Sequence, residues 1–216
     1  MTTPTRPEPL VILGAGGHGR EVLDLVEAVN GTEPRYRVVG FVDDDPQQPE
    51  LALARGVPLL DGFDDPRAEG AAFVAGVGSP EGRRALVGRA EAMGLRPVSL
   101  RHPTTVSGSV NREGEGLLVF ALASYTTNVT FGRHVHVNRT ATIGHDCVLG
   151  DFCSLHPGAV LSGDVHLGEA VTIGTGATVI QGVRIGAGTF VGAGAAVVRD
   201  LPPGVVAVGV PARPLT

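Results

Sequence analysis

The sequence predicts a small α/β domain with a parallel sheet, residues 1–100, followed by a β-solenoid, residues 101–216. In the first part, strand-like segments alternate with segments of helical spacing, which is typical of a parallel sheet covered by helices. In the second part, apolar residues recur every six positions, a period that indicates a repeat architecture. The 32 glycines and the absence of tryptophan among 216 residues agree, because they indicate many turns around a narrow core.

The first domain begins with an expected buried strand at 10–13, a glycine-rich loop at 14–19 and a helix at 20–29. The loop carries a GxGxxG pattern, which directs backbone N–H groups and a helix N-terminus toward a phosphate. The same glycines would also let a strand and a helix pack closely without any ligand. The pattern alone leaves both explanations open.

Two more strands are expected at 37–42 and 72–77, and a helix at 83–93 leads to the solenoid. Because only about 90 residues precede the solenoid, the domain corresponds to one half of a dinucleotide-binding fold and favours a mononucleotide. Asp43 and Asp44 follow the second strand. Ligands bind at the carboxyl ends of parallel strands, so we expect these carboxylates to contact a base or a ribose.

The solenoid follows from counting in sixes: from Val119 to Val197, all fourteen positions are apolar, and the fourth residue after each is small or β-branched at almost every repeat. This period fits neither a helix nor an uninterrupted strand. It fits a short strand followed by a corner, with glycine favoured there, as at Gly144. Cys147 and Cys153 occupy small-residue positions and are expected to pack in the core.

Charge and composition exclude several functions. The net charge of −5 and the lack of a basic run argue against nucleic acid and anionic membranes as partners. The N-terminal apolar run is too short for a membrane span, so a cytoplasmic protein is expected. Two cysteines cannot form a disulfide framework or a CxxC metal pair.

Both halves together resemble the hexapeptide-repeat sugar acetyltransferases, typified by bacillosamine and perosamine N-acetyltransferases and grouped with sialic acid O-acetyltransferases. The resemblance rests on the segments 14–19, 41–44, 78–83, 138–146 and 209–212. It implies a Rossmann-like half domain that holds a nucleotide-linked sugar, and a left-handed parallel β-helix that binds acetyl-coenzyme A (acetyl-CoA). It also implies a homotrimer with active sites between subunits.

The resemblance assigns roles to individual residues. The substrate-binding residues that it implies are Gly16, Gly17, His18, Asp43, Asp44, Gly78, Glu81 and Asn138. Those implied for binding of acetyl-CoA are Ser154, Gly163, Thr175, Ala193, Gly209 and Pro211. His145 is implied as the catalytic base and Asp146 as its acidic partner.

The repeat itself supports the choice of His145. This residue follows the aliphatic position Ile143 by two, at a corner, so its side chain is expected to face outward. Histidine has the pKa range that proton removal from an attacking amine requires, and Asp146 would orient its ring. One coil of eighteen residues further on lies Gly163, where a bare corner would leave room for a thioester and offer a backbone N–H. The alternative is a solvated surface histidine.

The other histidines are less informative. Many relatives have a second histidine at the position of Ser154, whereas the nearest imidazole here is His156, at a different point of the repeat. His134, His136 and His166 are expected at the surface or in subunit contacts. Related solenoids hold zinc through a His-x4-His pair and a third histidine. No two solenoid histidines are five apart, so we predict no metal.

The expected function is acetyl-CoA-dependent N-acetylation of a UDP-, GDP- or dTDP-linked amino sugar. Direct attack is expected, without an acyl-enzyme, because no cysteine is suitably placed as a nucleophile. A role in surface glycan biosynthesis is implied by the family alone. Two alternatives remain open at this point: O-acetylation of a sugar of the sialic acid type, and a non-catalytic scaffold. The sequence leaves the base, the sugar and the acetylated ring position undetermined.

Overall fold

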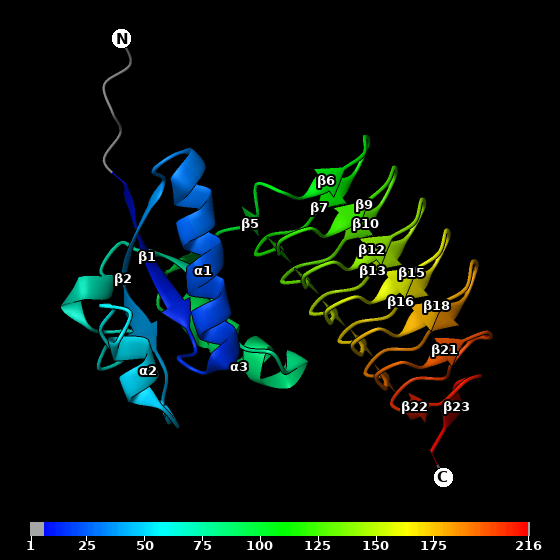
Figure 1. Ribbon diagram of the computed structural model, residues 1–216. Helices are drawn as coiled ribbons and strands as arrows, with labels where there is room; N and C mark the ends of the chain where they lie inside the picture. Colours follow the sequence, from blue (N-terminus) through cyan, green and yellow to red (C-terminus); the bar gives the residue numbers. More distant parts are fainter. Residues whose placement is uncertain (1–6, 216) are drawn as a thin grey trace. The chain divides into compact units, whose positions relative to one another are not determined.

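The structure of this protein, a computed structural model, describes residues 7–215 (Figure 1). The chain divides into two compact units, Met1–Leu100 and Arg101–Thr216. No helix in the described part of the chain is long and apolar enough to cross a membrane.

The first unit is built on a four-stranded parallel sheet with strand order β2-β1-β3-β4. Its strands are β1 (Glu8–Leu13), β2 (Tyr36–Val42), β3 (Ala72–Ala75) and β4 (Arg96–Pro97). Its helices are α1 (Gly17–Thr32), α2 (Pro49–Leu53), the short 3-10 helix η1 (Pro66–Ala68) and α3 (Pro80–Ala92). β1 and β3 lie in the middle of the sheet, and their apolar side chains are buried.

Several boundaries differ from the expectation for local reasons. α1 begins inside the glycine loop because Gly16 is its N-cap residue. α3 begins at Pro80 because the Ser79 hydroxyl accepts a hydrogen bond from the Gly82 N–H at 3.1 Å and proline favours a first helical turn. The residues expected to lead from helix to solenoid, Arg96 and Pro97, instead form strand β4. α2, η1 and β4 are too short to show a periodicity.

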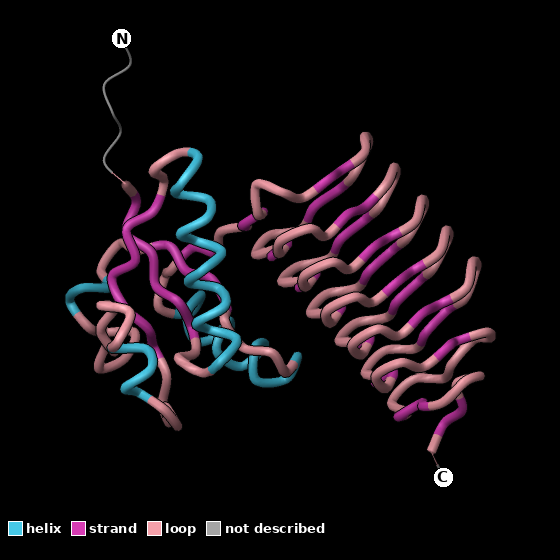
Figure 2. The backbone as a smooth tube through the Cα atoms, viewed as in Figure 1, coloured by secondary structure: helices cyan, strands magenta, loops and turns pink. Residues whose placement is uncertain are grey.

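The second unit is a solenoid of short parallel strands in three sheets (Figure 2). Between residues 106 and 197, each strand pairs in parallel with the strand eighteen residues away, as in the pairing of Leu118 with His136. The last two strands differ, because Phe190 pairs with Val206 and Val208 pairs antiparallel with Arg213. The strands are β5 (Leu100–Arg101), β6 (Val106–Ser107), β7 (Arg112–Glu113), β8 (Leu118–Val119), β9 (Ser124–Tyr125), β10 (Thr130–Phe131), β11 (His136–Val137), β12 (Thr142–Ile143), β13 (Val148–Leu149), β14 (Ser154–Leu155), β15 (Val160–Leu161), β16 (His166–Leu167), β17 (Thr172–Ile173), β18 (Thr178–Val179), β19 (Arg184–Ile185), β20 (Phe190–Val191), β21 (Ala196–Val197), β22 (Val206–Val208) and β23 (Arg213–Pro214).

We name the three sheets as faces. The first face contains β5, β8, β11, β14, β17, β20, β22 and β23; the second contains β6, β9, β12, β15, β18 and β21; the third contains β7, β10, β13, β16 and β19. The chain turns from the first face to the second, from the second to the third, and from the third back to the first. We call these corners the first–second, second–third and third–first edges.

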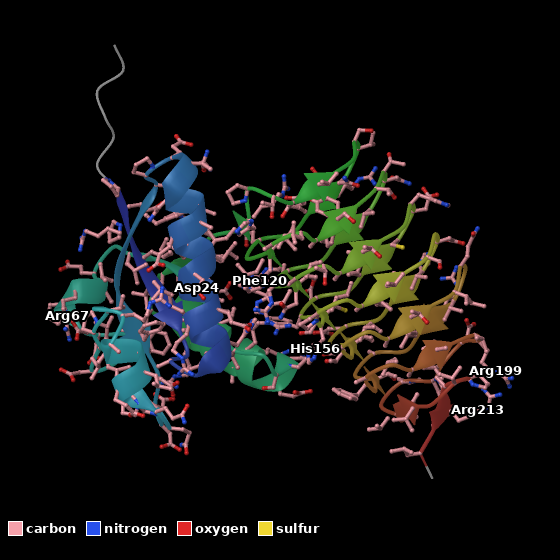
Figure 3. The ribbon with its side chains drawn as sticks, in the orientation of Figure 1. Asp24, Arg67, Phe120, His156, Arg199 and Arg213 are labelled. Atoms are coloured by element: carbon pink, nitrogen blue, oxygen red, sulfur yellow. The ribbon has the colours of Figure 1, made fainter. Side chains whose placement is uncertain are left out.

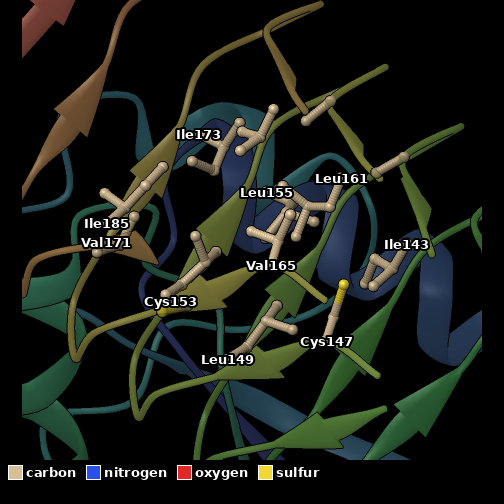
Figure 4. Close-up of a cluster of buried hydrophobic side chains, with 14 of the residues drawn as sticks. Ile143, Cys147, Leu149, Cys153, Leu155, Leu161, Val165, Val171, Ile173 and Ile185 are labelled. Carbon is tan, nitrogen blue, oxygen red and sulfur yellow. The ribbon is translucent and has the colours of Figure 1, made fainter. Parts of the chain in front are cut away.

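The six-residue repeat is confirmed. Each apolar position that the count predicted is the second residue of a strand from β8 to β21 and is buried. The core packs one such side chain against a small one from the next corner, as Figure 4 shows for Ile143 and Cys147. Both predicted core cysteines are buried: the Cys147 thiol donates to the Ser162 carbonyl at 3.1 Å, and the Cys153 thiol donates to that of Gly168 at 3.0 Å.

The glycines next to the aliphatic positions serve packing between coils, not the turn that we expected them to make. Gly144 lies outside the left-handed region, but an added Cβ would lie 2.6 Å from the backbone N of Gly163 in the next coil. The left-handed turn is made two residues later, and non-glycine residues often make it, as at Asp146 with φ 62°. The position directly after the core residue therefore needs glycine because the next coil lies so close. The position two residues later, where the chain turns, accepts other residues.

The solenoid has one coil more than the count predicted. Strands β5, β6 and β7 precede the first counted position, and their inward positions carry Arg101, Ser107 and Glu113. The Tyr125 hydroxyl donates a hydrogen bond to the Glu113 carboxylate at 2.8 Å, and the Arg101 guanidinium lies 5.6 Å from the Tyr125 ring centroid. These polar groups cover the first end of the apolar core.

Tyr125→Phe tests this cover. The variant is expected to lose about 1 kcal/mol of unfolding free energy at pH 7, the usual net contribution of one hydrogen bond. Burial and the Glu113 carboxylate raise the pKa of Tyr125 to about 12. The folded state therefore holds this proton more tightly than the unfolded chain, whose tyrosines have a pKa of about 10. The difference from the parent should be full below pH about 10 and disappear as the pH rises through the folded value. Urea unfolding across this range measures both effects, and a constant difference at every pH would contradict the assignment.

Candidate functional site

A cavity of about 560 Å³ lies at the carboxyl ends of β1, β2 and β3 in the first unit. It brings together six of the seven residues that we assigned to substrate in this domain and leaves out Glu81, in the first turn of α3. The lining residues are Gly14, Gly16, Gly17, His18, Asp43, Asp44, Asp45, Gly76, Val77, Gly78, Gly82, Ala85, Leu86 and Arg89.

The glycines of the GxGxxG pattern serve two purposes, close packing of helix against strand and open space for a ligand. An added Cβ on Gly19 would lie 2.0 Å from the Gly14 carbonyl oxygen, so Gly19 serves the close packing of α1 against the sheet. Gly14 adopts φ 94°, which favours glycine. An added Cβ on Gly16 would meet no heavy atom within 4 Å. Gly16 therefore leaves open space at the N-terminus of α1, beside the cavity.

Asp43 ties the end of β2 to the glycine loop. One of its carboxylate oxygens accepts the Ala15 N–H at 2.7 Å, and the other accepts the Asp45 N–H at 3.0 Å. These bonds fix the shape of two loops that line the cavity. Contact of Asp43 with a ligand stays a prediction.

Asp44 forms an ion pair with Arg89 of α3 across the cavity wall. The hydrogen bond from Arg89 lowers the pKa of Asp44. The guanidinium also lies 4.9 Å from the centroid of the Phe63 ring. Arg89 was not among the predicted residues, because nothing in the helical spacing of α3 indicates a partner 45 residues earlier.

His145 and Asp146 form an exposed pair at the second–third edge. The Nδ1 atom of His145 lies 2.7 Å from a carboxylate oxygen of Asp146, and the two side chains are 52% and 49% exposed. The second oxygen of Asp146 accepts a hydrogen bond from the Asn128 amide at 2.7 Å. Hydrogen bonds from Asn128 and then His145 lower the pKa of Asp146. An ionised carboxylate only accepts, so Nδ1 is the donor in this contact, and in the neutral imidazole Nε2 presents the lone pair.

Gly163 lies directly beside the His145 ring, in the next coil. An added Cβ would stand 2.5 Å from both Cε1 and Nε2 of His145. The predicted neighbourhood of the two residues is therefore present, but the space left by the missing side chain holds the imidazole itself. Among the described residues, the Gly163 N–H has no hydrogen-bond acceptor, so it is available as a donor.

The remaining predicted residues of the solenoid lie elsewhere on it. Asn138, Thr175 and Ala193 follow strands of the first face, at the first–second edge. Ser154 is in β14 on the first face and only 3% exposed. Gly209 and Pro211 follow β22, where the Gly209 carbonyl accepts the Ala196 N–H at 3.1 Å. Within a single chain, therefore, these predicted residues do not lie next to His145.

His156 follows β14 at the first–second edge (Figure 3), one coil below Asn138, whose backbone N–H donates to Leu155. It therefore differs in position from Ser154, as the repeat predicted. Which of the two replaces the second histidine of relatives stays open.

Two histidines expected at the surface are buried. His134 is 1% exposed because its ring folds over Gly116 and stacks on Phe152, with centroids 5.4 Å apart. His136 is 3% exposed. His166 is at the surface, with Nε2 3.1 Å from the Asp164 carboxylate. Residues 7–215 contain no group of three or more His, Cys, Asp or Glu side chains arranged to hold a metal ion.

Comparisons with known proteins agree with this architecture. The PglD N-terminal domain family matches residues 9–90. GDP-perosamine N-acetyltransferase of Escherichia coli O157:H7 is 35% identical over 70 residues, and this match spans 32% of each chain, about a third of the curated relative.

Solved structures match over nearly the whole chain. The acetyltransferase domain of PglB from Neisseria gonorrhoeae FA1090 has 32% identity and a TM-score of 0.85, covering 96% of this chain and 100% of that one. A histidine-to-asparagine variant of perosamine N-acetyltransferase from Caulobacter crescentus, in complex with CoA and GDP-perosamine, has 36% identity and a TM-score of 0.86, covering 96% and 97%.

The α/β half domain and the left-handed parallel β-helix, together with the solved relatives, define a hexapeptide-repeat acyltransferase. The predicted fold class is confirmed. Within this class, the chain belongs to the sugar acetyltransferase family of the PglB and perosamine enzymes, which use acetyl-CoA.

Proposed function

We propose that this protein transfers an acetyl group from acetyl-CoA to the amino group of a nucleotide-linked amino sugar, with His145 as general base. The observation that carries the proposal is the geometry of His145: a half-exposed ring, oriented by an ionised aspartate through Nδ1, with Nε2 beside a free backbone N–H. The substrate class is supported by the solved relative bound to CoA and GDP-perosamine. A cytoplasmic location and a role in surface glycan synthesis stay predictions.

The transfer is one displacement. The sugar amine attacks the thioester carbonyl carbon, and His145 Nε2 removes the amine proton as the C–N bond forms. Asp146 stabilises the resulting imidazolium, and the Gly163 N–H is the available donor for the developing oxyanion. The C–S bond then breaks, and the imidazolium returns its proton to the CoA thiolate. An acyl-enzyme is not part of the proposal, because both cysteines are buried and burial raises the pKa of the Cys147 thiol.

The cavity of the first unit is the proposed nucleotide site. Its volume of about 560 Å³ is in the range of small-molecule pockets. The backbone N–H groups of Gly16 and Gly17 open α1 and would bind the diphosphate, because a helix N-terminus favours anions. Asp43, Asp44, His18 and Gly78 line the same cavity.

The separation of the predicted residues supports a site shared between subunits. His145 lies at the second–third edge, whereas Asn138, Thr175 and Ala193 lie at the first–second edge. In a closed threefold ring, the same two surfaces of each chain meet around the axis. We therefore propose a homotrimer in which one chain supplies His145 and its neighbour supplies the groove for acetyl-CoA. Sedimentation analysis tests this, and a monomer that is fully active would overturn it.

The function is tested with acetyl-CoA and a panel of UDP-, GDP- and dTDP-linked 4-amino sugars. Release of the CoA thiol together with a sugar product heavier by one acetyl group is the expected result. Free sialic acid in the same panel separates O-acetylation from N-acetylation. Tight binding of acetyl-CoA without turnover on any acceptor would instead favour a scaffold.

Gly16→Ala tests the nucleotide site alone. The added methyl group meets no protein atom within 4 Å and the residue has φ −67°, so we expect the fold to survive, with only the small loss of unfolding temperature that alanine causes at an N-cap. The methyl group would stand where a phosphate approaches the helix, so nucleotide affinity should fall about tenfold, equivalent to about 1.4 kcal/mol. Gly31→Ala is the matched control, since its Cβ also meets nothing within 4 Å but lies near the other end of α1. Equal nucleotide affinity in both variants would exclude the site.

A further inference from the structure

We propose that Asn128 is a positioning residue for the general base, because it anchors Asp146 in the orientation in which Asp146 holds His145. The inference rests on the proposed role of His145. Asn128 does not reach the reacting atoms in this arrangement; it acts through the Asp146 carboxylate. Asn128 was not among the residues predicted from the sequence.

The first observation is the register of the solenoid. Asn128 lies one coil before Asp146 at the second–third edge, and both residues adopt the left-handed conformation, with φ 57° and 62°. Because the coils repeat every eighteen residues, the two side chains leave equivalent backbone positions in adjacent coils. The amide of Asn128 reaches one Asp146 oxygen at 2.7 Å, and His145 Nδ1 lies 2.7 Å from the other.

The second observation fixes the direction of the amide. The Arg112 guanidinium donates to the Asn128 side-chain oxygen at 3.4 Å. The amide oxygen therefore faces the cation of the preceding strand, and the amide nitrogen faces the carboxylate. Arg112 of β7, on the third face, and Asn128, Asp146 and His145 at the second–third edge form a chain of donors and acceptors in which every link has compatible polarity.

The third observation is exposure. Asp146 and His145 are each about half exposed, so packing alone does not fix either side chain. A half-exposed carboxylate bound only to its neighbouring imidazole would sample other rotamers and hydrogen-bond to water. A second, charge-assisted bond to a fixed amide reduces this freedom. The bond to the amide also reduces the negative charge that the Asp146 carboxylate presents to the imidazole. We expect the gain from a single ring orientation to be larger than this loss, because misplacing a reacting group strongly slows the reaction.

Asn128→Gly tests the inference without straining the backbone, because glycine accepts a positive φ that alanine does not. Val110→Gly is the matched control. Val110 lies one coil earlier at the same edge, has φ 61° and is 69% exposed. Both full-length variants are compared with the parent by steady-state kinetics and by 15N NMR of histidine-labelled protein, with the His145 signal assigned from a His145→Gln sample.

In Asn128→Gly we expect the His145 population that is protonated on Nδ1 to fall toward that of a free imidazole. We expect kcat to fall about tenfold, less than the roughly 10²-fold that displacement of a reacting group by about 1 Å can cost, with KM within twofold. Val110→Gly should retain the parent values. An unchanged His145 tautomer in Asn128→Gly would overturn the inference, as would the same shift in Val110→Gly. The NMR result does not depend on activity, so failure of the proposed function remains distinguishable.

Discussion

His145→Ala is expected to lower kcat for acetyl transfer by about 10²- to 10⁴-fold, the usual contribution of a positioned general base. The reason is specific to this geometry: Nε2 presents a lone pair because Asp146 holds the proton on Nδ1. Removing the ring removes the proton acceptor but no core contact, since the side chain is half exposed. The affinity for acetyl-CoA and the unfolding temperature should therefore stay close to those of the parent. Initial rates with saturating acetyl-CoA, together with thermal unfolding, measure both.

The chain contains a matched control for this variant. His166 is also an outward histidine paired with an aspartate, Asp164, at 3.1 Å. It lies on the third face, one coil after the His145 corner, and no glycine opens a space for its ring. His166→Ala should retain the parent kcat. If His145→Ala turns over at a near-normal rate while folded, His145 is not the base; if both variants lose activity equally, the loss reflects the solenoid surface and not the dyad.

The repeat could be predicted because each core position by itself requires one kind of side chain, whatever the rest of the fold. In each strand from β8 to β21, one buried core position requires an apolar side chain, and counting in sixes detects it. Counting in sixes did not detect the first coil, because polar side chains occupy its inward positions. Arg101, Glu113 and the Tyr125 hydroxyl cover the end of the core there. The rule fails where the core meets its boundary.

The site could be predicted only in part, for a related reason. His145 and Asp146 are adjacent in the chain, so their pairing needs no knowledge of the fold. Asn128 could have been predicted, because it lies eighteen residues, one coil, before Asp146. Arg89 was not, since its contact with Asp44 depends on how α3 packs against the sheet. Pairings that follow the period are available from sequence, whereas those between elements of different kinds are not.

Gly163→Ala is the second substitution with a large expected effect, because it acts on the His145 ring without touching its chemistry. The added Cβ would lie 2.5 Å from Cε1 and Nε2 of His145, closer than real carbon contacts allow. Gly163 does not have a positive φ, so alanine does not strain its backbone. The atoms it meets are the far end of a half-exposed side chain, so the ring should rotate away and break its 2.7 Å contact with Asp146. We expect the fold to survive, with kcat lowered about 10²-fold.

A double-mutant cycle separates this cause from any direct effect of Gly163 on the thioester. If Gly163→Ala acts by displacing the ring, it should cause no further loss of kcat in the His145→Ala background, because the ring is already gone. Additive losses would show that Gly163 contributes through its own backbone N–H or the space beside it. Thermal unfolding gives the matching structural test: the added methyl group should destabilise the parent slightly and the His145→Ala variant not at all. That result would mean that residue 163 must be glycine to make room for the imidazole. The position of the base would then depend on the coil that carries His145 and on the next coil, which carries Gly163.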